Sequence, residues 1–165
     1  PAAVERAERL AAGPGGRWSP ASLSLPVALE QSRLNQTYNT PALATLFLFV
    51  DQLEWMLANG GLEWAAARSR KSSDIVYGWA EASSYARPFV ADPGDRSPVV
   101  ATVDLDDAVD AKVVAKVLRH NGIVDTDSYR GLARNQLRIA VYPAVEPDDV
   151  AILTQAVDHI VERLT

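Results

Sequence analysis

The feature that most restricts the fold of this chain is an apolar segment that covers residues 43–57. Its apolar residues recur at helical spacing, and Leu48, Phe49 and Trp55 add apolar side chains on other faces of the same helix. The most apolar run, residues 41–50, is about half as long as a membrane-spanning helix needs to be. The segment therefore predicts a helix that is buried on several sides, by its own domain or by a partner subunit.

The composition excludes several classes of protein. Hydrophobic residues make up 48% and charged residues 22%, which is typical of a globular protein with a buried core. The net charge of -5 argues against nucleic-acid binding, because displacing counterions from phosphates needs a basic surface. The chain has no cysteine, so disulfides, thiolate zinc sites and thiol nucleophiles are excluded. We expect a cytoplasmic protein without a signal peptide or membrane span, whose partners are small molecules or proteins.

Turn signals divide the chain around the apolar helix. A short helical pattern over residues 4–10 is followed by glycines and prolines, including Gly13 to Gly16, which predict a connecting arm. Asn59, Gly60 and Gly61 predict the end of the apolar helix, and a second long helix is expected over residues 62–82. From Tyr85 onward, short β-branched runs alternate with helices, which indicates a domain boundary between residues 60 and 85.

We expect the C-terminal part to be an α+β sandwich with the order ββαββα, in which helices cover one face of a small sheet. The predicted strands are residues 87–91, 98–104, 123–124 and 137–142, and the predicted helices are residues 110–120 and 147–164. Asp110 is the expected N-cap of the first of these helices. In the last strand, alternation places Ile139 and Val141 on the core face and Arg138 on the opposite face.

The start of the apolar helix is a candidate phosphate site. Thr40 in front of Pro41 is the pattern of an N-cap followed by the first helical residue. The free amides there, the Thr40 hydroxyl and the helix dipole would attract a phosphate, and Asn39 adds a further donor. Plain capping explains the same residues, so both interpretations stay open on this evidence.

Arginines near the last predicted strand are candidates for anion binding. The planar fork of Arg138 matches a carboxylate, so this residue is either an internal salt-bridge partner or a substrate clamp. Arg130 and Arg134 lie just upstream in a predicted loop, where they either extend an anion site or are solvated. Arg68, with its basic neighbours, is expected on a solvated helix face.

No metal site is expected. The acidic cluster from Asp104 to Asp110 does not fit a calcium loop, because Val109 and Ala115 stand where the required glycine and bidentate glutamate belong. Helix capping is the simpler interpretation of these aspartates. His120 and His159 have no second histidine or cysteine near them in the sequence, so neither indicates a metal ligand.

Four stretches, taken in their order and spacing, resemble phosphoserine aminotransferase in its actinobacterial form. They are NQTYNTPA (35–42), NGGL (59–62), GIVDT (122–126) and NQLRIAVYPAV (135–145). The resemblance covers nearly the whole chain. It implies a homodimeric enzyme of fold type I with pyridoxal phosphate held in a large domain. Residues 1–60 would be the C-terminal tail of that large domain, comprising the arm and the long helix, and residues 61–165 would be the small C-terminal domain.

The resemblance also implies roles for individual residues. Asn39 and Thr40 would reach across the dimer to the cofactor phosphate, and Arg138 would bind the α-carboxylate of the substrate. A His-Arg pair that helps to bind the substrate phosphate in several members is most similar here to residues 129–130. The spacing from this pair to Arg138 is longer than in the family, so the role stays open between Arg130 and Arg134.

The family's cofactor-linked lysine would precede residue 1. Lys71, Lys112 and Lys116 lie in helical patterns, and none resembles the cofactor lysine motif. The full-length enzyme would transfer an amino group between glutamate and 3-phosphohydroxypyruvate to give phosphoserine in L-serine biosynthesis, and this chain alone is expected to be inactive. One alternative is a non-catalytic α+β module for dimerisation or small-ligand regulation, in which the apolar helix is buried within a monomer. The other is an aminotransferase of the same fold with another acceptor.

Overall fold

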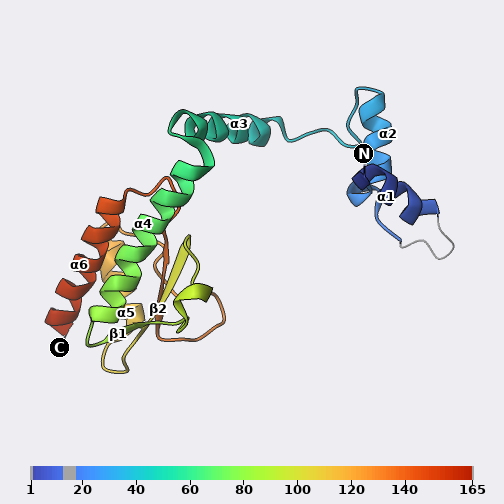
Figure 1. Cartoon of the computed structure of the whole chain (residues 1–165). Coiled ribbons are helices and arrows are strands. Elements are labelled where there is room, and N and C mark those ends of the chain that lie inside the picture. The colour runs from blue at the N-terminus through green and yellow to red at the C-terminus, as the bar shows by residue number, and fades with distance from the viewer. Residues whose placement is uncertain (1, 13–17, 165) are drawn as a thin grey trace. The chain divides into compact units, whose positions relative to one another are not determined.

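The computed structural model describes residues 2–12 and 18–164 (Figure 1). The chain forms two compact units, Pro1–Glu54 and Trp55–Thr165, and each is considered by itself. The glycines expected in the connecting arm, Gly13 to Gly16, lie outside the described residues. None of the helices in the described ranges is long and apolar enough to cross a membrane.

The first unit consists of short helices and most of one longer helix. These are α1 (Ala2–Ala12), η1 (Ala21–Leu23), α2 (Leu25–Arg33) and the greater part of α3 (Leu43–Ala58). The Ser24 hydroxyl accepts a hydrogen bond from the Val27 amide and so caps α2. Apolar side chains of α1 and α2, including Val4 and Leu29, line an open hollow of about 280 Å³ between the two helices. The expected short helix near the N-terminus is therefore confirmed.

Helix α3 starts later than the sequence predicts, so the expectation that Thr40 is its N-cap is wrong. The helix begins at Leu43, and the Leu46 amide donates to the Ala42 carbonyl at 3.0 Å, which puts Ala42 at the cap position. The physical reason lies in Pro41. Its fixed φ near -65° suits extended backbone as well as the first turn of a helix, so a Thr-Pro pair does not fix the start.

The predicted turn at Asn59, Gly60 and Gly61 is confirmed. The Gly60 amide donates to the Leu57 carbonyl at 3.1 Å, and Gly60 has φ +113°, a left-handed conformation that favours glycine. A Cβ atom at Gly60 would lie 3.0 Å from the Cβ of Trp64. Helix α4 (Gly61–Ala82) starts directly after this turn, as predicted.

The surface of α3 is apolar and exposed. None of its side chains is buried within the described part of the chain, so these residues do not supply the expected burial, and burial by a partner subunit stays a prediction. Phe47 and Leu57 are 72% and 70% exposed, and their neighbours Leu43 and Leu48 are similarly open. An apolar surface of this kind is typical of an interface that another domain or subunit covers.

The second unit is an α+β domain. Its elements after α4 are β1 (Ala86–Pro88), η2 (Pro93–Asp95), β2 (Val100–Leu105), α5 (Ala111–His120), β3 (Gln136–Ala140) and α6 (Pro147–Leu164). The strands form an antiparallel sheet in the order β1-β2-β3. Thr102 of β2 lies opposite Arg138 of β3, and Asp104 lies opposite both Arg87 and Gln136.

The expected strand at residues 123–124 is not formed, so the order is ββαβα instead of ββαββα. Gly122 and Asp125, on either side of these two residues, have φ +86° and +62°. Extended pairing cannot continue through left-handed positions, which leaves too short a stretch for a ladder. The segment is attached to β3 by the Arg138 amide, which donates to the Thr126 carbonyl at 3.0 Å.

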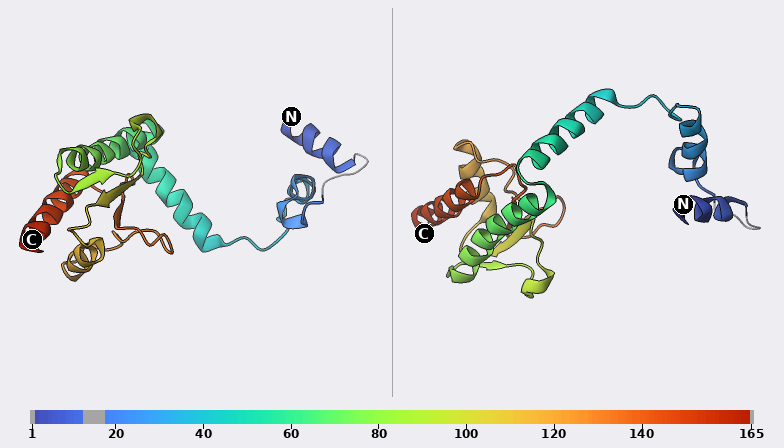
Figure 2. Two further views of the ribbon diagram at one scale, coloured as in Figure 1. Left: turned by 90° about the horizontal axis from the view of Figure 1, so that it is seen from below. Right: turned by 45° about the horizontal axis from the view of Figure 1, so that its top comes forward.

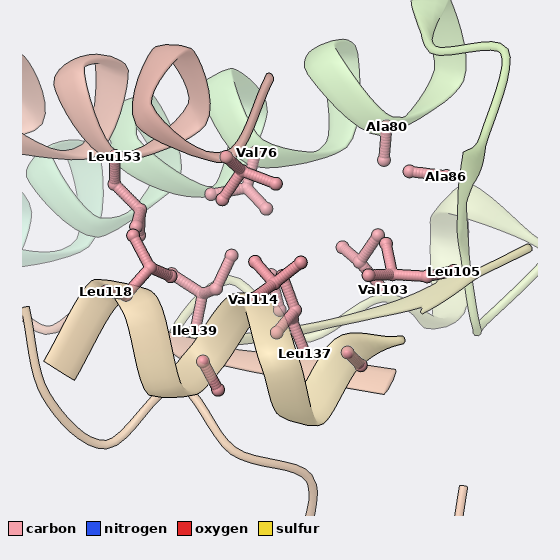
Figure 3. Close-up of a cluster of buried hydrophobic side chains, with 14 of the residues drawn as sticks. Val76, Ala80, Ala86, Val103, Leu105, Val114, Leu118, Leu137, Ile139 and Leu153 are labelled. Atoms are coloured by element: carbon pink, nitrogen blue, oxygen red, sulfur yellow. The ribbon is translucent and has the colours of Figure 1, made fainter. Parts of the chain in front are cut away.

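The core lies between one face of the sheet and helices α4, α5 and α6. Helices α4 and α6 pack against each other (Figure 2). Buried side chains such as Val76 of α4, Val114 and Leu118 of α5, and Leu137 and Ile139 of β3 meet in this core (Figure 3). Because side chains alternate along a strand, Arg138 lies on the opposite face of the sheet.

Candidate functional site

Arg138 lies in the middle of β3 between two core residues. Leu137 is fully buried and Ile139 is 3% exposed, whereas Arg138 is partly exposed, so the predicted alternation is confirmed. Its guanidinium carbon is 5.4 Å from the centre of the Tyr129 ring, a cation–π contact. Among the residues that the structure describes, no carboxylate forms an ion pair with Arg138. This free fork favours the clamp interpretation over an internal salt bridge.

An open pocket of about 580 Å³ surrounds the exposed side of Arg138. Its lining consists of Asp125, Asp127, Ser128, Tyr129, Arg130 and Arg138. The structure therefore brings two of the predicted anion-binding residues, Arg130 and Arg138, into one cavity. A second hollow of about 460 Å³ shares Arg138 and Asp125 with this pocket and is otherwise mainly apolar, with Ile152 of α6 in its lining.

Arg134, the other candidate for the substrate phosphate, forms a bidentate ion pair with Asp104. Its Nε and Nη2 donate to the two carboxylate oxygens at 2.9 and 2.7 Å, and its guanidinium lies 4.5 Å from the Phe89 ring centre. Gln136 donates to the same carboxylate at 2.8 Å. The hydrogen bonds from Arg134 lower the pKa of Asp104 and raise the pKa of Arg134 itself. The Asp104 side chain is buried, so this pair has a structural role.

The loop that forms one wall of the pocket is attached at two points. Arg119, at the end of α5, donates through Nη2 to Asp125 at 2.9 Å and to Asp127 at 3.3 Å. Between these aspartates, the Thr126 carbonyl accepts from the Arg138 amide. The Thr126 hydroxyl is buried and has no hydrogen-bond partner within the described ranges. Arg119 was not among the residues predicted from the sequence. The signal that could have found it is a basic residue in the last turn of a helix with two aspartates shortly after it.

Asn135 holds the start of β3 in place, and sequence reasoning missed it. Its side-chain oxygen accepts from the Ala111 amide at 2.8 Å, and its nitrogen donates to the carbonyls of Leu105, Asp106 and Val109. One side chain thus joins the end of β2, the loop after it and the start of α5. This arrangement fixes where β3, and therefore Arg138, begins.

Arg68 does not lie on a solvated helix face, so that expectation is wrong. Its Nε donates to the Pro143 carbonyl at 2.6 Å, it forms an ion pair with Glu146, and it lies 5.3 Å from the Trp64 ring centre. These partners come from the segment between β3 and α6, which is remote in sequence. Arg68 therefore holds the end of β3 against α4.

Asn39 and Thr40 lie in the first unit, in a bend that precedes α3. Both residues are exposed, and the Asn39 carbonyl accepts a hydrogen bond from the Thr37 hydroxyl at 2.7 Å. In the part of the chain that the structure covers, the Asn39 side-chain amide and the Thr40 hydroxyl have no hydrogen-bond partner. Two polar groups are therefore available to a ligand.

The acidic cluster is explained by capping and pairing. The Asp110 side chain accepts from the Lys112 amide at 2.8 Å, which confirms Asp110 as the N-cap of α5. Asp106 accepts from the Asp107 amide. Within residues 2–12 and 18–164, no group of three or more potential ligands is arranged to hold a metal ion. Asp106 and Asp110 therefore serve the local backbone, whereas Asp104 pairs with Arg134.

No protein-family model matches the chain. A protein of Mycolicibacterium vanbaalenii, assigned as a phosphoserine aminotransferase, is 61% identical over 164 residues, which are 99% of this chain and 44% of the relative. The phosphoserine aminotransferase of Rhodococcus jostii is 53% identical over 164 residues, 99% of this chain and 43% of its own length. This chain is homologous to the C-terminal part of phosphoserine aminotransferases. It spans less than half the length of the curated relatives that it matches.

A solved structure gives the same assignment for the fold. The phosphoserine aminotransferase from Bacillus circulans subsp. alkalophilus has a TM-score of 0.79 at 25% identity, over 97% of this chain and 42% of that one. The match confirms an α+β fold that corresponds to the C-terminal part of a fold-type I aminotransferase. The domain boundary expected near residue 60 stays a prediction.

Proposed function

We propose that this chain is the C-terminal part of an aminotransferase that exchanges an amino group between glutamate and 3-phosphohydroxypyruvate, forming phosphoserine for L-serine biosynthesis in the cytoplasm. The observation that carries the proposal is the free guanidinium of Arg138 in a pocket that also contains Arg130. The homology to named phosphoserine aminotransferases supports the same reaction. Both substrates are anions, and two arginines in one cavity suit them.

Arg138 is the proposed clamp for the α-carboxylate that both substrates share. A planar guanidinium can hold a carboxylate by two parallel hydrogen bonds, which fix orientation as well as affinity. The guanidinium is held at one side by the Tyr129 ring, and its strand is held at both ends by Asn135 and Arg68. A fixed strand presents the clamp in one position.

Arg130 is the proposed ligand of the substrate phosphate. Arg134 already uses Nε and Nη2 in its bond to Asp104, whereas Arg130 lines the same cavity as Arg138. Moving Arg134 to a substrate would leave the buried Asp104 carboxylate without its main partner, which is unfavourable. We therefore propose Arg130, and not Arg134, for this role.

Pyridoxal phosphate is the proposed cofactor, and Asn39 and Thr40 are the residues of this chain that would hold its phosphate. Their side chains are exposed polar groups with no partner in the described residues, which fits a phosphate ligand. When bound, the cofactor supplies a ring that withdraws electrons from the substrate Cα. Lys71, Lys112 and Lys116 are exposed on helices, which does not fit the cofactor-linked lysine, so we place that lysine in the rest of the protein.

A homodimer is part of the proposal. The apolar surface of α3 is open in this chain, which supports burial by the remainder of the protein or by a second subunit. Asn39 and Thr40 precede this helix directly, so an interface on α3 would bring them to a neighbouring subunit. The alternative of a self-contained regulatory module requires α3 to be sealed within the monomer, and the exposed side chains do not support it.

The acceptor specificity tests the proposal. The purified full-length protein, loaded with pyridoxal phosphate, should transfer the amino group of glutamate to 3-phosphohydroxypyruvate with a much higher kcat/KM than to pyruvate or oxaloacetate. The comparison separates the proposed reaction from an aminotransferase of the same fold with another acceptor. A preference for an acceptor without phosphate would refute the assignment of Arg130 and the substrate.

A further inference from the structure

The pocket around Arg138 contains as many carboxylates as guanidinium groups. Asp125 and Asp127 line it together with Arg130 and Arg138. A substrate that carries both a phosphate and a carboxylate would be repelled by the two aspartates as much as it is attracted by the two arginines. The lining alone therefore does not explain how this cavity binds an anion of high charge.

Arg119 supplies the missing positive charge from outside the lining. It stands in the last turn of α5, and its Nη2 donates to Asp125 at 2.9 Å and to Asp127 at 3.3 Å. These hydrogen bonds, first that to Asp125 and then that to Asp127, raise the pKa of Arg119. One guanidinium thus contacts both carboxylates and offsets one of their two negative charges.

The contact of Arg119 with Asp125 and Asp127 holds the loop that forms one wall of the pocket. Asp125 has φ +62°, and the next residue, Thr126, accepts the backbone hydrogen bond from Arg138. The side chains of Arg119, Asp125 and Asp127 are all at least half exposed, and exposed ion pairs contribute little to folding stability. A role in folding is therefore not expected, and the effect of Arg119 should be found in ligand binding.

We propose that Arg119 is a positioning residue that determines specificity, because its charge offsets part of the charge of Asp125 and Asp127 and so leaves the pocket with a net positive charge for the substrate. The inference rests on the proposed function for the identity of the substrate. It goes beyond that proposal by assigning the preference for a doubly charged anion to a residue that does not line the pocket. It follows that Arg119 should affect the binding of a doubly charged anion more than the binding of a singly charged one.

The test uses the full-length protein with Arg119→Gln. We expect the KM for 3-phosphohydroxypyruvate and the Kd for inorganic phosphate to rise by roughly fivefold at low salt, given the loss of one unit charge about 8 Å from a phosphate dianion in a water-like dielectric. The KM for glutamate should rise less, because glutamate carries no phosphate dianion. Raising KCl from about 20 mM to about 500 mM shortens the Debye length from roughly 20 Å to about 4 Å and should remove most of the effect.

Matched variants distinguish the loss of the Arg119 charge from a change in the structure of the pocket. Arg163→Gln removes one positive charge from the exposed end of α6, away from the pocket lining, and should leave both constants within about twofold. Asp125→Asn combined with Asp127→Asn in the Arg119→Gln background should bring both constants back to the wild-type values or below them, because it removes both negative charges from the pocket. Arg119→Lys keeps the charge and should stay near the wild type.

Two arms distinguish failure of this inference from failure of the proposed function. If the wild type transaminates 3-phosphohydroxypyruvate but Arg119→Gln leaves both constants unchanged, the inference is wrong and the proposed function stands. An effect that the two Asn substitutions do not reverse would also refute it, because Arg119 would then act through structure. If the wild type lacks the activity but phosphate binding weakens in Arg119→Gln and recovers with the Asn pair, the inference stands and the proposed substrate is wrong.

Discussion

Replacing Arg138 with lysine should impair both halves of the proposed reaction by similar factors. Lysine keeps the positive charge but cannot form two parallel hydrogen bonds with a carboxylate. A hydrogen bond to a charged group contributes about 1.5–3 kcal/mol. Arg138 is partly exposed and lies beside Tyr129, so we take the lower part of that range, about 1.5–2 kcal/mol, for the bond that is lost. This corresponds to a decrease in kcat/KM of roughly 10- to 30-fold.

Single-turnover measurements of each half-reaction in the full-length protein give the decisive comparison. Glutamate and 3-phosphohydroxypyruvate share the α-carboxylate, so Arg138→Lys should lower kcat/KM for both. Arg130→Ala is the matched variant, and it should impair the phosphorylated substrate more than glutamate. If Arg138→Lys leaves the glutamate half-reaction within about twofold of the wild type, a change of only about 0.4 kcal/mol, Arg138 is not the carboxylate clamp.

Three further predictions concern the cofactor and the stability of the C-terminal unit. Incubation of this chain alone with pyridoxal phosphate and borohydride should label no lysine in full yield, because its lysines are exposed on helices; one stoichiometric label, read by mass spectrometry, would contradict this. Changing both Asn39 and Thr40 to Ala in the full-length protein should weaken cofactor binding by about 1–3 kcal/mol, measured by equilibrium dialysis, and unchanged retention would contradict it. Burial, together with the hydrogen bond to Asp158, raises the pKa of Tyr85, so its contribution to stability should be complete below about pH 10 and lost as the pH rises further. Urea unfolding above that pH should show a smaller loss for Tyr85→Phe than for the wild type, and an equal loss in the two proteins would contradict this.

The parts of the fold that follow local rules could be predicted from the sequence. The period of two along β3 was enough to place Arg138 opposite the core, because Leu137 and Ile139 had to be buried together. The glycines at 60 and 61 marked the turn between α3 and α4, since few other residues adopt a left-handed conformation there. Asp110 was recognisable as a cap from its position before an apolar helical pattern.

The parts that depend on distant partners could not be predicted in the same way. Arg134 and Asp104 are separated by 30 residues, and Arg68 and Pro143 by 75, so no local pattern connects them. The missing strand near residue 123 depends on the backbone of Asp125, whose left-handed conformation is uncommon for a residue other than glycine. Apolar spacing alone predicts a strand there, and it says nothing about such a turn.

The open surface of α3 has a practical consequence for producing this chain. An exposed apolar helix promotes self-association and capture by chaperones. The chain expressed alone should therefore aggregate more readily than its C-terminal unit. That unit, residues 55–165, has its own core of buried side chains from α4, α5, α6 and the sheet. An expression fragment that omits about the first three turns of α3 would remove Phe47 and its apolar neighbours while retaining the Gly60 turn, Arg119 and the Arg138 pocket. Isotope-labelled material of that kind would allow the loop beside Arg138 to be followed residue by residue during titration with phosphate.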